Sequence, residues 1–370
     1  MNSFGDRFRF TTFGESHGKA VGCIVEGVPA GLKLDEVFLQ TELDRRKPGR
    51  NSSMTQRKED DRVEILSGVF EGVCTGSPIA FVIYNKNQKS RDYNNIKEIF
   101  RPGHADISYF MKYGLRDYRG GGRSSARESA ARVCAGAVAK LILKEIDIEV
   151  VGGVYSIGDI EAQNIDFEHA KRSDIYTLDS SLESSQKALI EMVKKEGDSI
   201  GGSVLVKVKN PPPGLGEPMY GKLDAKIGGI FMGLNGVKGL EIGLGCEASL
   251  KKGSEDNDPI REDGLKTNNS GGILGGISTG EDIDIKVYFK PTPSIFKKQK
   301  SIKESGEEVE FSLKGRHDPC IAIRGSVVAE AQAAIVIADA LLCDMGRRMD
   351  DVRVIYSNRR SFEDFFRSGE

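Results

Sequence analysis

The chain has 370 residues, of which 44 are glycine, and its 53 lysines and arginines nearly balance its 55 aspartates and glutamates. An apolar content of 38% excludes a disordered chain, and a formal net charge of -2 argues against a surface that holds nucleic acid by charge alone. The first ten residues contain Asp6, Arg7 and Arg9, and no uncharged apolar run is long enough to span a membrane. We therefore expect a cytoplasmic globular protein with neither a membrane nor a nucleic-acid partner.

The cysteines and histidines bound the chemistry further. The six cysteines lie singly, without a Cys-x-x-Cys pair or a cysteine–histidine spacing that suits zinc, so we expect buried free thiols and no metal site. Of the four histidines, His17, His104 and His317 lie in segments rich in glycine and arginine, where binding groups are common. His169 lies in a polar linker, and we assign it no role.

An internal repeat organises the chain. Residues 14–32 and 197–215 each contain a Gly-x-Ser loop, a valine-rich stretch and a Pro-Gly turn, and Lys-Leu-Asp follows each at the start of a possible helix. Residues 68–84 and 272–288 form a second matching pair. In the later copy apolar and charged residues alternate, as in a strand with one solvated face.

A long helix is predicted at the end of each repeat. Apolar residues recur at helical spacing over 129–143 and 325–345, and a shorter amphipathic helix is expected near 184–196. We predict one domain over residues 1–370, with pseudo-repeats at about 1–146 and 197–346 joined by a helical linker. The predicted fold class is α+β, internally duplicated, with two antiparallel sheets packed as a sandwich and the helices outside.

Two loops present histidines. Gly14-Glu15-Ser16-His17-Gly18 precedes a predicted strand, and the second repeat has Ile200 where the first has His17, so this loop does not need an imidazole to fold. That difference favours a functional role for His17 over a structural one, and an imidazole titrates near neutral pH, as a general acid must. Arg101-Pro102-Gly103-His104 is a second such loop, although loop histidines are often only solvated.

A run of glycines and arginines precedes the first long helix. Residues 119–127 read RGGGRSSAR, which combines exposed backbone N–H groups, hydroxyls and guanidinium groups in the manner of a phosphate or carboxylate site. The alternative is that Ser124 or Ser125 only caps the helix while the arginines stay solvated. The run is neither a Walker loop nor a Rossmann fingerprint. Residues 315–320, GRHDPC, place a carboxylate beside an arginine, and together these loops indicate acid–base chemistry on a small, multiply anionic substrate.

Several long motifs then resemble those of the chorismate synthase family. They are GESHGKAVGCIVEGVP at 14–29, RPGHAD at 101–106, GRSSARESAARV at 122–133 and RHDPC at 316–320. The resemblance spans essentially the whole chain. It implies an anti-1,4-elimination of phosphate from 5-enolpyruvylshikimate 3-phosphate to give chorismate, in the shikimate pathway of aromatic amino acid biosynthesis. It also implies reduced FMN as cofactor, NADPH only as a source of reductant, and a homotetramer.

The same resemblance implies residue roles. His17 would protonate the leaving phosphate, His104 would lie near the reduced flavin and supply its proton, and Asp318 would set the protonation of the flavin N5. The implied substrate contacts are Ser16, Arg46, Arg101, Ser125 and Arg127. The implied FMN contacts are Arg123, Ser124, Ser125, Asn235, Gly236, Gly275, Lys290, Pro291, Thr292, Pro293, Ser294 and Arg316. The implied NADP contacts are Arg46 and Ser52.

Two positions depart from the family pattern. Ser52 stands where relatives commonly have a basic residue, and Pro293 stands where many have a serine. An NADPH-dependent flavin reductase is the alternative enzyme, although the chain has no Rossmann fingerprint. An RNA-binding protein could be argued from the glycine–arginine run, but the balanced net charge opposes it.

Overall fold

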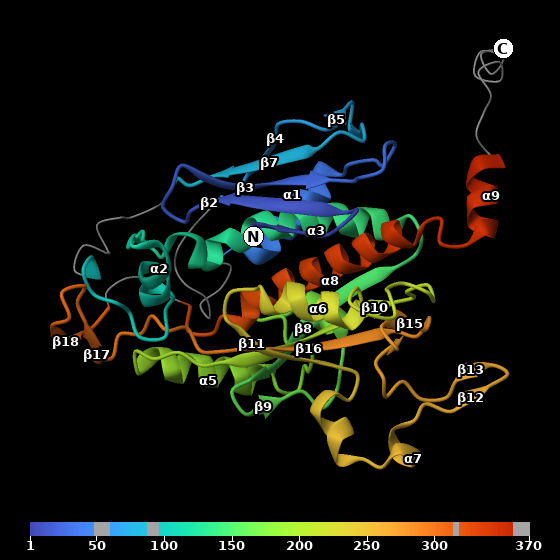
Figure 1. Cartoon of the computed structure of the whole chain (residues 1–370). Helices are drawn as coiled ribbons and strands as arrows, with labels where there is room; N and C mark the ends of the chain where they lie inside the picture. Colours follow the sequence, from blue (N-terminus) through green and yellow to red (C-terminus); the bar gives the residue numbers. More distant parts are fainter. Residues whose placement is uncertain (48–59, 87–95, 314–317, 358–370) are drawn as a thin grey trace.

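The computed structural model describes residues 1–47, 60–86, 96–313 and 318–357, and two five-stranded antiparallel sheets form its main layers (Figure 1). The first sheet contains, in spatial order, β1 (Ser3–Phe4), β2 (Arg9–Gly14), β3 (Ala20–Glu26), β7 (Ile79–Tyr84) and β4 (Val63–Ile65). The second contains β11 (Val237–Ile242), β16 (Ile283–Phe289), β10 (Gly202–Lys209), β8 (Glu149–Ile157) and β9 (Ile160–Glu161).

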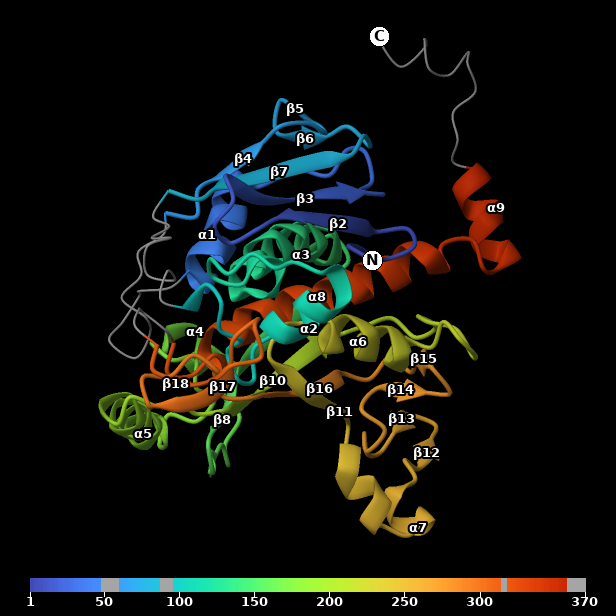
Figure 2. The same cartoon turned by 60° about the vertical axis from the view of Figure 1, so that its left-hand side comes forward.

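Helices lie between these two sheets, so the predicted placement of the helices outside a sheet-on-sheet sandwich is wrong (Figures 1 and 2). The inner helices are α1 (Glu36–Arg46), α3 (Ser129–Lys144), α6 (Leu223–Met232) and α8 (Ala322–Asp344). Helix α3 packs against β3 and β7 of the first sheet, whereas α8 packs against β8 and β10 of the second. The two helices cross so closely that a Cβ on Gly136 would lie 2.3 Å from that of Ala331.

The composition of α8 explains why it is internal. Every residue of α8 from Ala322 to Ala340 is buried, and most of them are alanine, valine or isoleucine. Its charged residues Arg324, Glu330 and Asp339 are buried as well, each in an ion pair, so the helix has no face for water and is covered all round. By length and mean hydropathy of 1.7 this helix could cross a membrane, but 83% of the apolar window is buried inside the protein. Within the described residues it is therefore a core helix.

The remaining helices and two-stranded ribbons pack around these layers. The outer helical elements are α2 (Asp106–Tyr113), η2 (Gly122–Ser124), η3 (Ala126–Glu128), α4 (Phe167–Arg172), α5 (Glu183–Lys195), η4 (Gly245–Leu250), α7 (Gly253–Asp256) and α9 (Met349–Ser357). Two-stranded ribbons form from β5 (Val69–Phe70) with β6 (Val73–Cys74), β12 (Ile260–Arg261) with β13 (Gly264–Leu265), β14 (Ile273–Leu274) with β15 (Ile277–Ser278), and β17 (Gln299–Ile302) with β18 (Glu308–Phe311). Helices α4 and α5 contact β8, and α5 is the helix expected in the linker.

Strands from the two predicted repeats hold matching places in their sheets. In the first sheet β3, β7 and β4 are neighbours in that order, and in the second β10, β16 and β11 follow in the same way. Strand β8 takes the place that β2 has in the first sheet, but it lies in the predicted linker between the repeats. Each half also contributes one long helix to the middle layer, α3 and α8. The loops that carry the predicted site precede these helices.

Candidate active site

His17 lies in the turn that joins β2 to β3 and is only 5% exposed. Its Nδ1 is 3.0 Å from the hydroxyl of Ser16. Against the ring lies Gly120, where a Cβ would fall 2.4 Å from the imidazole, and Gly120 has a φ of +65°. The predicted substrate contact Ser16 and the predicted acid His17 are therefore hydrogen-bonded to each other and buried against the glycine run.

His104 lies against the next residue of the same run. A Cβ on Gly121 would fall 2.5 Å from its Cε1 and 2.9 Å from its Nε2. Because consecutive glycines contact the rings of His17 and His104, the structure brings together two histidines that are far apart in the sequence. Any side chain at Gly120 or Gly121 would collide with an imidazole.

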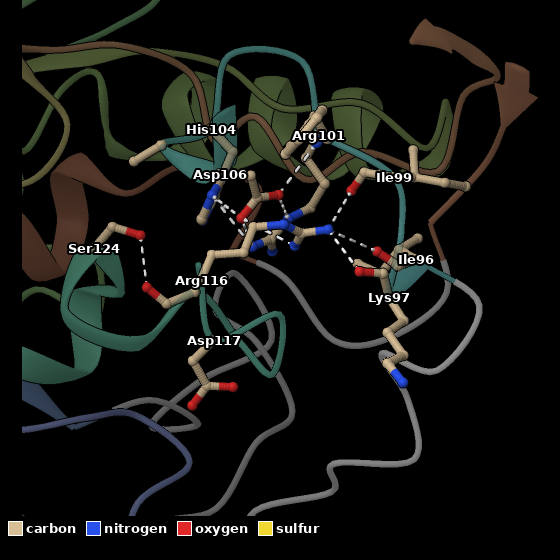
Figure 3. Close-up of polar contacts among 12 residues, drawn as sticks. Ile96, Lys97, Ile99, Arg101, His104, Asp106, Arg116, Asp117 and Ser124 are labelled. Atoms are coloured by element: carbon tan, nitrogen blue, oxygen red, sulfur yellow. Dashed lines mark hydrogen bonds and ion pairs between the residues drawn. The ribbon is translucent and has the colours of Figure 1, made fainter. Parts of the chain in front are cut away.

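The other edge of His104 faces charged groups (Figure 3). Its Nδ1 is 3.0 Å from Oδ1 of Asp106, and Arg101 donates to the same carboxylate from Nε at 2.7 Å and from Nη2 at 2.9 Å. Burial lowers the pKa of His104, and the positive charges of Arg101 and Lys290 lower it further, against the opposing effect of Asp106. We conclude that His104 is a neutral imidazole at pH 7.

Two predicted substrate arginines share one buried carboxylate. Arg46 ends α1 and donates from Nη1 to Oδ2 of Asp61 at 2.8 Å, while Arg127 donates from Nη1 to Oδ1 of Asp61. Arg127 also donates from Nε to the side chain of Asn85 at 2.9 Å. Burial raises the pKa of Asp61, but Arg46 and Arg127 more than compensate and hold it below its ordinary value.

Further charge gathers around this pair from the start of α8. Arg324 donates from Nη1 to Oδ2 of Asp318 at 2.6 Å. Burial and the neighbouring charge of Arg324 lower the pKa of Arg46 to about 9, against the opposing effect of Asp61. We call Arg46, Asp61, Arg127, Asp318 and Arg324 the Arg46 cluster. It has three guanidinium groups and two carboxylates.

The Arg46 cluster has hydrogen-bonding capacity to spare. Among the described residues, Nη2 of Arg127 and Nε of Arg324 are buried and have no hydrogen-bond partner. A buried donor without an acceptor is costly, and a buried cation in excess is costlier. An anionic ligand would relieve both, so the cluster is suited to bind a phosphate or carboxylate.

The predicted flavin contacts around the glycine run also meet. Nδ2 of Asn235 lies 3.4 Å from the carbonyl oxygen of Arg123 and 3.2 Å from that of Ser125. Arg123 itself turns toward β2 and donates to Thr12 Oγ1 at 2.8 Å. Ser124 donates to the Gly121 carbonyl at 2.7 Å. Ser125 caps the short helix η3, as the alternative reading of this loop required, and this cap does not prevent ligand binding by neighbouring groups.

The segment from Lys290 to Ser294 joins this group to the His104 loop. The backbone N–H of Lys290 donates to the Gly236 carbonyl at 2.9 Å, and its Nζ donates to the Gly103 carbonyl at 2.5 Å. Thr292 has a buried hydroxyl without a hydrogen-bond partner among the described residues. Pro293 lies beside Gly103, where a Cβ would be 3.3 Å away.

One predicted contact is not brought to this site. Gly275 lies in the β14–β15 ribbon. The next residue, Gly276, accepts a hydrogen bond from the backbone N–H of Leu223, the first residue of α6. Asn235 lies beyond the other end of α6, after its last turn. A helix of ten residues separates the two by about 15 Å. Arg316 and Ser52 lie outside the described residues.

A second ion-pair network occupies the opposite side of the same helix turn. Arg45 bonds to Glu330 through two nitrogens, at 2.7 and 2.8 Å, and to Glu42 at 2.7 Å. Lys140 contacts Glu42 at 2.5 Å and Glu330 at 2.6 Å. We call these four residues the Arg45 cluster. It lines part of a cavity of about 700 Å³, but its two cations and two carboxylates satisfy one another.

Asp61, Asp106 and Arg324 were missed by the sequence reading. Asp61 stands in a run of acidic residues that looks like a solvated segment, and Arg324 lies within an apolar helix. Asp106 ends the motif RPGHAD, and its spacing of two residues from His104 is the feature of the sequence that could have indicated its role. Another acidic group, Asp6 with Asp339 and Cys343, has metal-like spacing, but Lys226 already contacts both carboxylates, so we assign no metal to it.

Comparison with known proteins gives one consistent result. The chorismate synthase family model matches residues 8–342. A chorismate synthase of Sulfurimonas denitrificans is 62% identical over 96% of this chain and 99% of its own length, and one of Aliarcobacter butzleri is 60% identical over the same shares. A crystal structure of a chorismate synthase superposes with a TM-score of 0.75 at 34% identity, covering 96% of this chain and 98% of that one. The chain therefore belongs to the chorismate synthase family, whose members are lyases of aromatic amino acid biosynthesis.

Proposed function

We propose that the protein eliminates phosphate from 5-enolpyruvylshikimate 3-phosphate to give chorismate. The observation that carries this proposal is a link from the His17 loop to the Arg46 cluster: Asn85 donates to the carbonyls of Glu15 and Gly18 and accepts from Arg127. His104 meets the same glycine run as His17, and among the described residues the cluster has buried donors without partners. The reaction breaks a C–O bond and a C–H bond and forms a C=C bond, and the released phosphate takes the proton. The protein must therefore hold a polyanion and manage one proton.

The residues divide these tasks between them. Arg46, Arg101 and Arg127 would hold the phosphate and carboxylates, because each guanidinium is buried and always charged in the bound state. Ser16 and Ser125 would add hydroxyl donors. His17 would donate a proton to the departing phosphate, and its hydrogen bond to Ser16 fixes the orientation of the ring.

Reduced FMN fits the neighbouring groups. The glycine run, the Asn235–Gly236 turn and the segment Lys290–Ser294 are joined by direct hydrogen bonds. The buried hydroxyl of Thr292 has no hydrogen-bond partner among the described residues. These residues, with Arg123 and Ser124, would hold the cofactor beside His104. When bound, reduced FMN supplies the electron density that makes loss of the phosphate easier. Asp318 would set the protonation of the flavin N5, and Arg316 and Gly275 stay proposed FMN contacts.

The direct test is release of phosphate from 5-enolpyruvylshikimate 3-phosphate under anaerobic conditions with reduced FMN. Folded protein that releases no phosphate would contradict the proposal. Oxidation of NADPH with added FMN and no substrate would instead favour the flavin reductase. If NADPH acts here, we expect it only to reduce the flavin, through the Arg46 and Ser52 region.

Replacing His17 tests the proposed acid. We expect His17→Ala to lower turnover by about 10²- to 10⁴-fold, which is typical of the loss of a general acid, while FMN still binds. His169→Ala is the matched control, because His169 contacts Glu183 on α5, outside the candidate site. Unchanged turnover in His17→Ala would make the imidazole structural. A double variant with His104→Ala whose effects simply add would show that the two histidines act independently.

We further propose that the chain arose by internal duplication, that it assembles as a homotetramer, and that it acts in the cytoplasm without nucleic-acid or membrane partners. The matching strand orders of the two sheets support the duplication. Sedimentation of the purified protein would test the oligomeric state.

A further inference from the structure

Asp106 fixes two residues of the candidate site with a single carboxylate (Figure 3). It is the first residue of α2 and is only 3% exposed. Its Oδ2 accepts from the side chain and the backbone N–H of Arg101, at 2.7 and 3.1 Å, and its Oδ1 lies 3.0 Å from Nδ1 of His104. Behind it, Arg116 is held by the carbonyls of Lys97 and Ile99, with Nη1 3.7 Å from Oδ1.

We propose, building on the proposed function, that Asp106 is a positioning residue that holds His104 as the Nδ1-protonated tautomer and directs its Nε2 toward the ligand. An ionised carboxylate can only accept hydrogen bonds, so the proton between the two groups belongs to Nδ1. A neutral imidazole has one N–H, and Nε2 is then the nitrogen with a lone pair. Arg101 Nη2 also lies 3.2 Å from Nδ1 and can only donate, so it competes for a lone pair on that nitrogen. The contact of Nδ1 with the Asp106 carboxylate is the shorter one, at 3.0 Å, and it is attractive only with a proton on Nδ1.

The charges around the pair support this protonation pattern. Burial raises the pKa of Asp106, but hydrogen bonds from Arg101 and His104 outweigh it and hold that pKa well below its usual range. The charged groups that face His104 are Asp106, Arg101 and Lys290. Burial and the two cations lower the pKa of the imidazole by more than Asp106 raises it. The pair is then a carboxylate beside a neutral ring.

The geometry places the unprotonated edge on the reactive side. Cε1 and Nε2 of His104 face Gly121, opposite the edge that meets Asp106, and the adjacent Gly120 contacts His17. A flipped tautomer would present an N–H there, and Nε2 could then not take up the proton that His104 is proposed to pass to the flavin. Asp106 would thus act on the reaction through His104, without touching the substrate.

The tautomer can be measured in the wild-type protein, because the chain has only four histidines. We expect ¹⁵N spectra of histidine-labelled protein at pH 7 to show His104 with the proton on Nδ1. In Asp106→Asn the single amide oxygen is needed by Arg101, so the amide NH₂ would face the ring and the proton would move to Nε2. The matched control is Glu183→Gln, which alters a histidine–carboxylate pair with a 2.8 Å contact outside the site.

We expect Asp106→Asn to lower kcat about 100-fold, and Glu183→Gln to leave kcat unchanged. A wild-type His104 protonated on Nε2 would overturn the proposal even if the variant did not fold. Full kcat in a folded Asp106→Asn variant would also overturn it. Wild-type protein without phosphate release would contradict the proposed function instead, and the ¹⁵N result would still decide the tautomer.

Discussion

Two consecutive arginines at the end of α1 enter two different kinds of ion-pair cluster. Arg45 joins Glu42, Lys140 and Glu330, in which every named charge is paired. Arg46 joins Asp61, Arg127, Asp318 and Arg324 in a cluster with more cations than carboxylates, and two of its buried donors have no partner among the residues that the structure describes. The first arrangement is complete without a ligand, and the second is completed by an anion. The two clusters are both buried and both charged, so burial and charge do not distinguish them. They differ in whether each buried donor has an acceptor.

The largest effect of a single change should come from opening the Arg45 cluster. Arg45→Met leaves two buried carboxylates with Lys140 as their only cation in the cluster, and we expect the free energy of unfolding to fall by about 3–5 kcal/mol. Activity of the folded fraction should stay within a few-fold of wild type. Denaturant unfolding and assays at low temperature measure both quantities.

Lys47→Met is the matched control for that experiment. Lys47 follows Arg46 and pairs with Asp44 in a partly exposed contact, which should contribute less than about 1 kcal/mol. If Arg45→Met were as stable as this control, the Arg45 cluster would not be the structural one.

A change in the Arg46 cluster should lower activity and leave the free energy of unfolding nearly unchanged. Arg127→Gln removes a cation and an unpartnered donor proposed to meet the substrate, so we expect kcat/KM to fall about 100-fold, which corresponds to about 2.7 kcal/mol. The unfolding free energy should change by less than about 1 kcal/mol, because the lost contact to Asp61 is offset by reduced repulsion among the arginines. Arg132→Gln is the control, because Arg132 on α3 makes a more exposed pair with Glu128, the neighbour of Arg127 in η3. A large loss of stability without loss of kcat/KM would reverse the comparison.

Acid should weaken the Arg45 cluster through Glu42. Burial raises the pKa of Glu42, but Lys140 and Arg45 outweigh it and lower the pKa from 4.5 to about 2. A depressed pKa means that this stabilisation is complete above the unfolded-state value and is lost as the pH falls from about 4.5 to about 2. We expect about 3 kcal/mol of unfolding free energy to disappear over that range. Glu42→Gln should be less stable at pH 7 and should show a shallower pH dependence; an unaltered slope would exclude Glu42 as its source.

The sequence predicts the parts of this molecule that depend on local pattern. The periodicity of residues 129–143 and 325–345 predicts α3 and α8. Their position between the sheets could not be predicted in this way, because α8 is buried on every side and a search for one apolar stripe treats the other sides as solvated. His17 and His104 were found because glycine-rich loops present few other reactive groups. Asp61 could not be found, because an acidic residue in a charged run gains its meaning only when the fold buries it between Arg46 and Arg127.

Stabilisation by inorganic phosphate is the smallest predicted effect, and it distinguishes the Arg46 cluster from the Arg45 cluster most directly. Inorganic phosphate should bind the Arg46 cluster in the protein without substrate or flavin. Within the described part of the chain, Arg127 and Arg324 have buried donors without partners, whereas the Arg45 cluster has none. At ten times its dissociation constant, phosphate would raise the unfolding free energy by about 1.4 kcal/mol. The measurement is thermal unfolding in phosphate against chloride at equal ionic strength, so that general screening cancels. The stabilisation should vanish in Arg127→Gln and persist in Arg45→Met. Equal stabilisation of both variants would mean that phosphate binds elsewhere, and the hydrogen-bond balance would then not identify the ligand site.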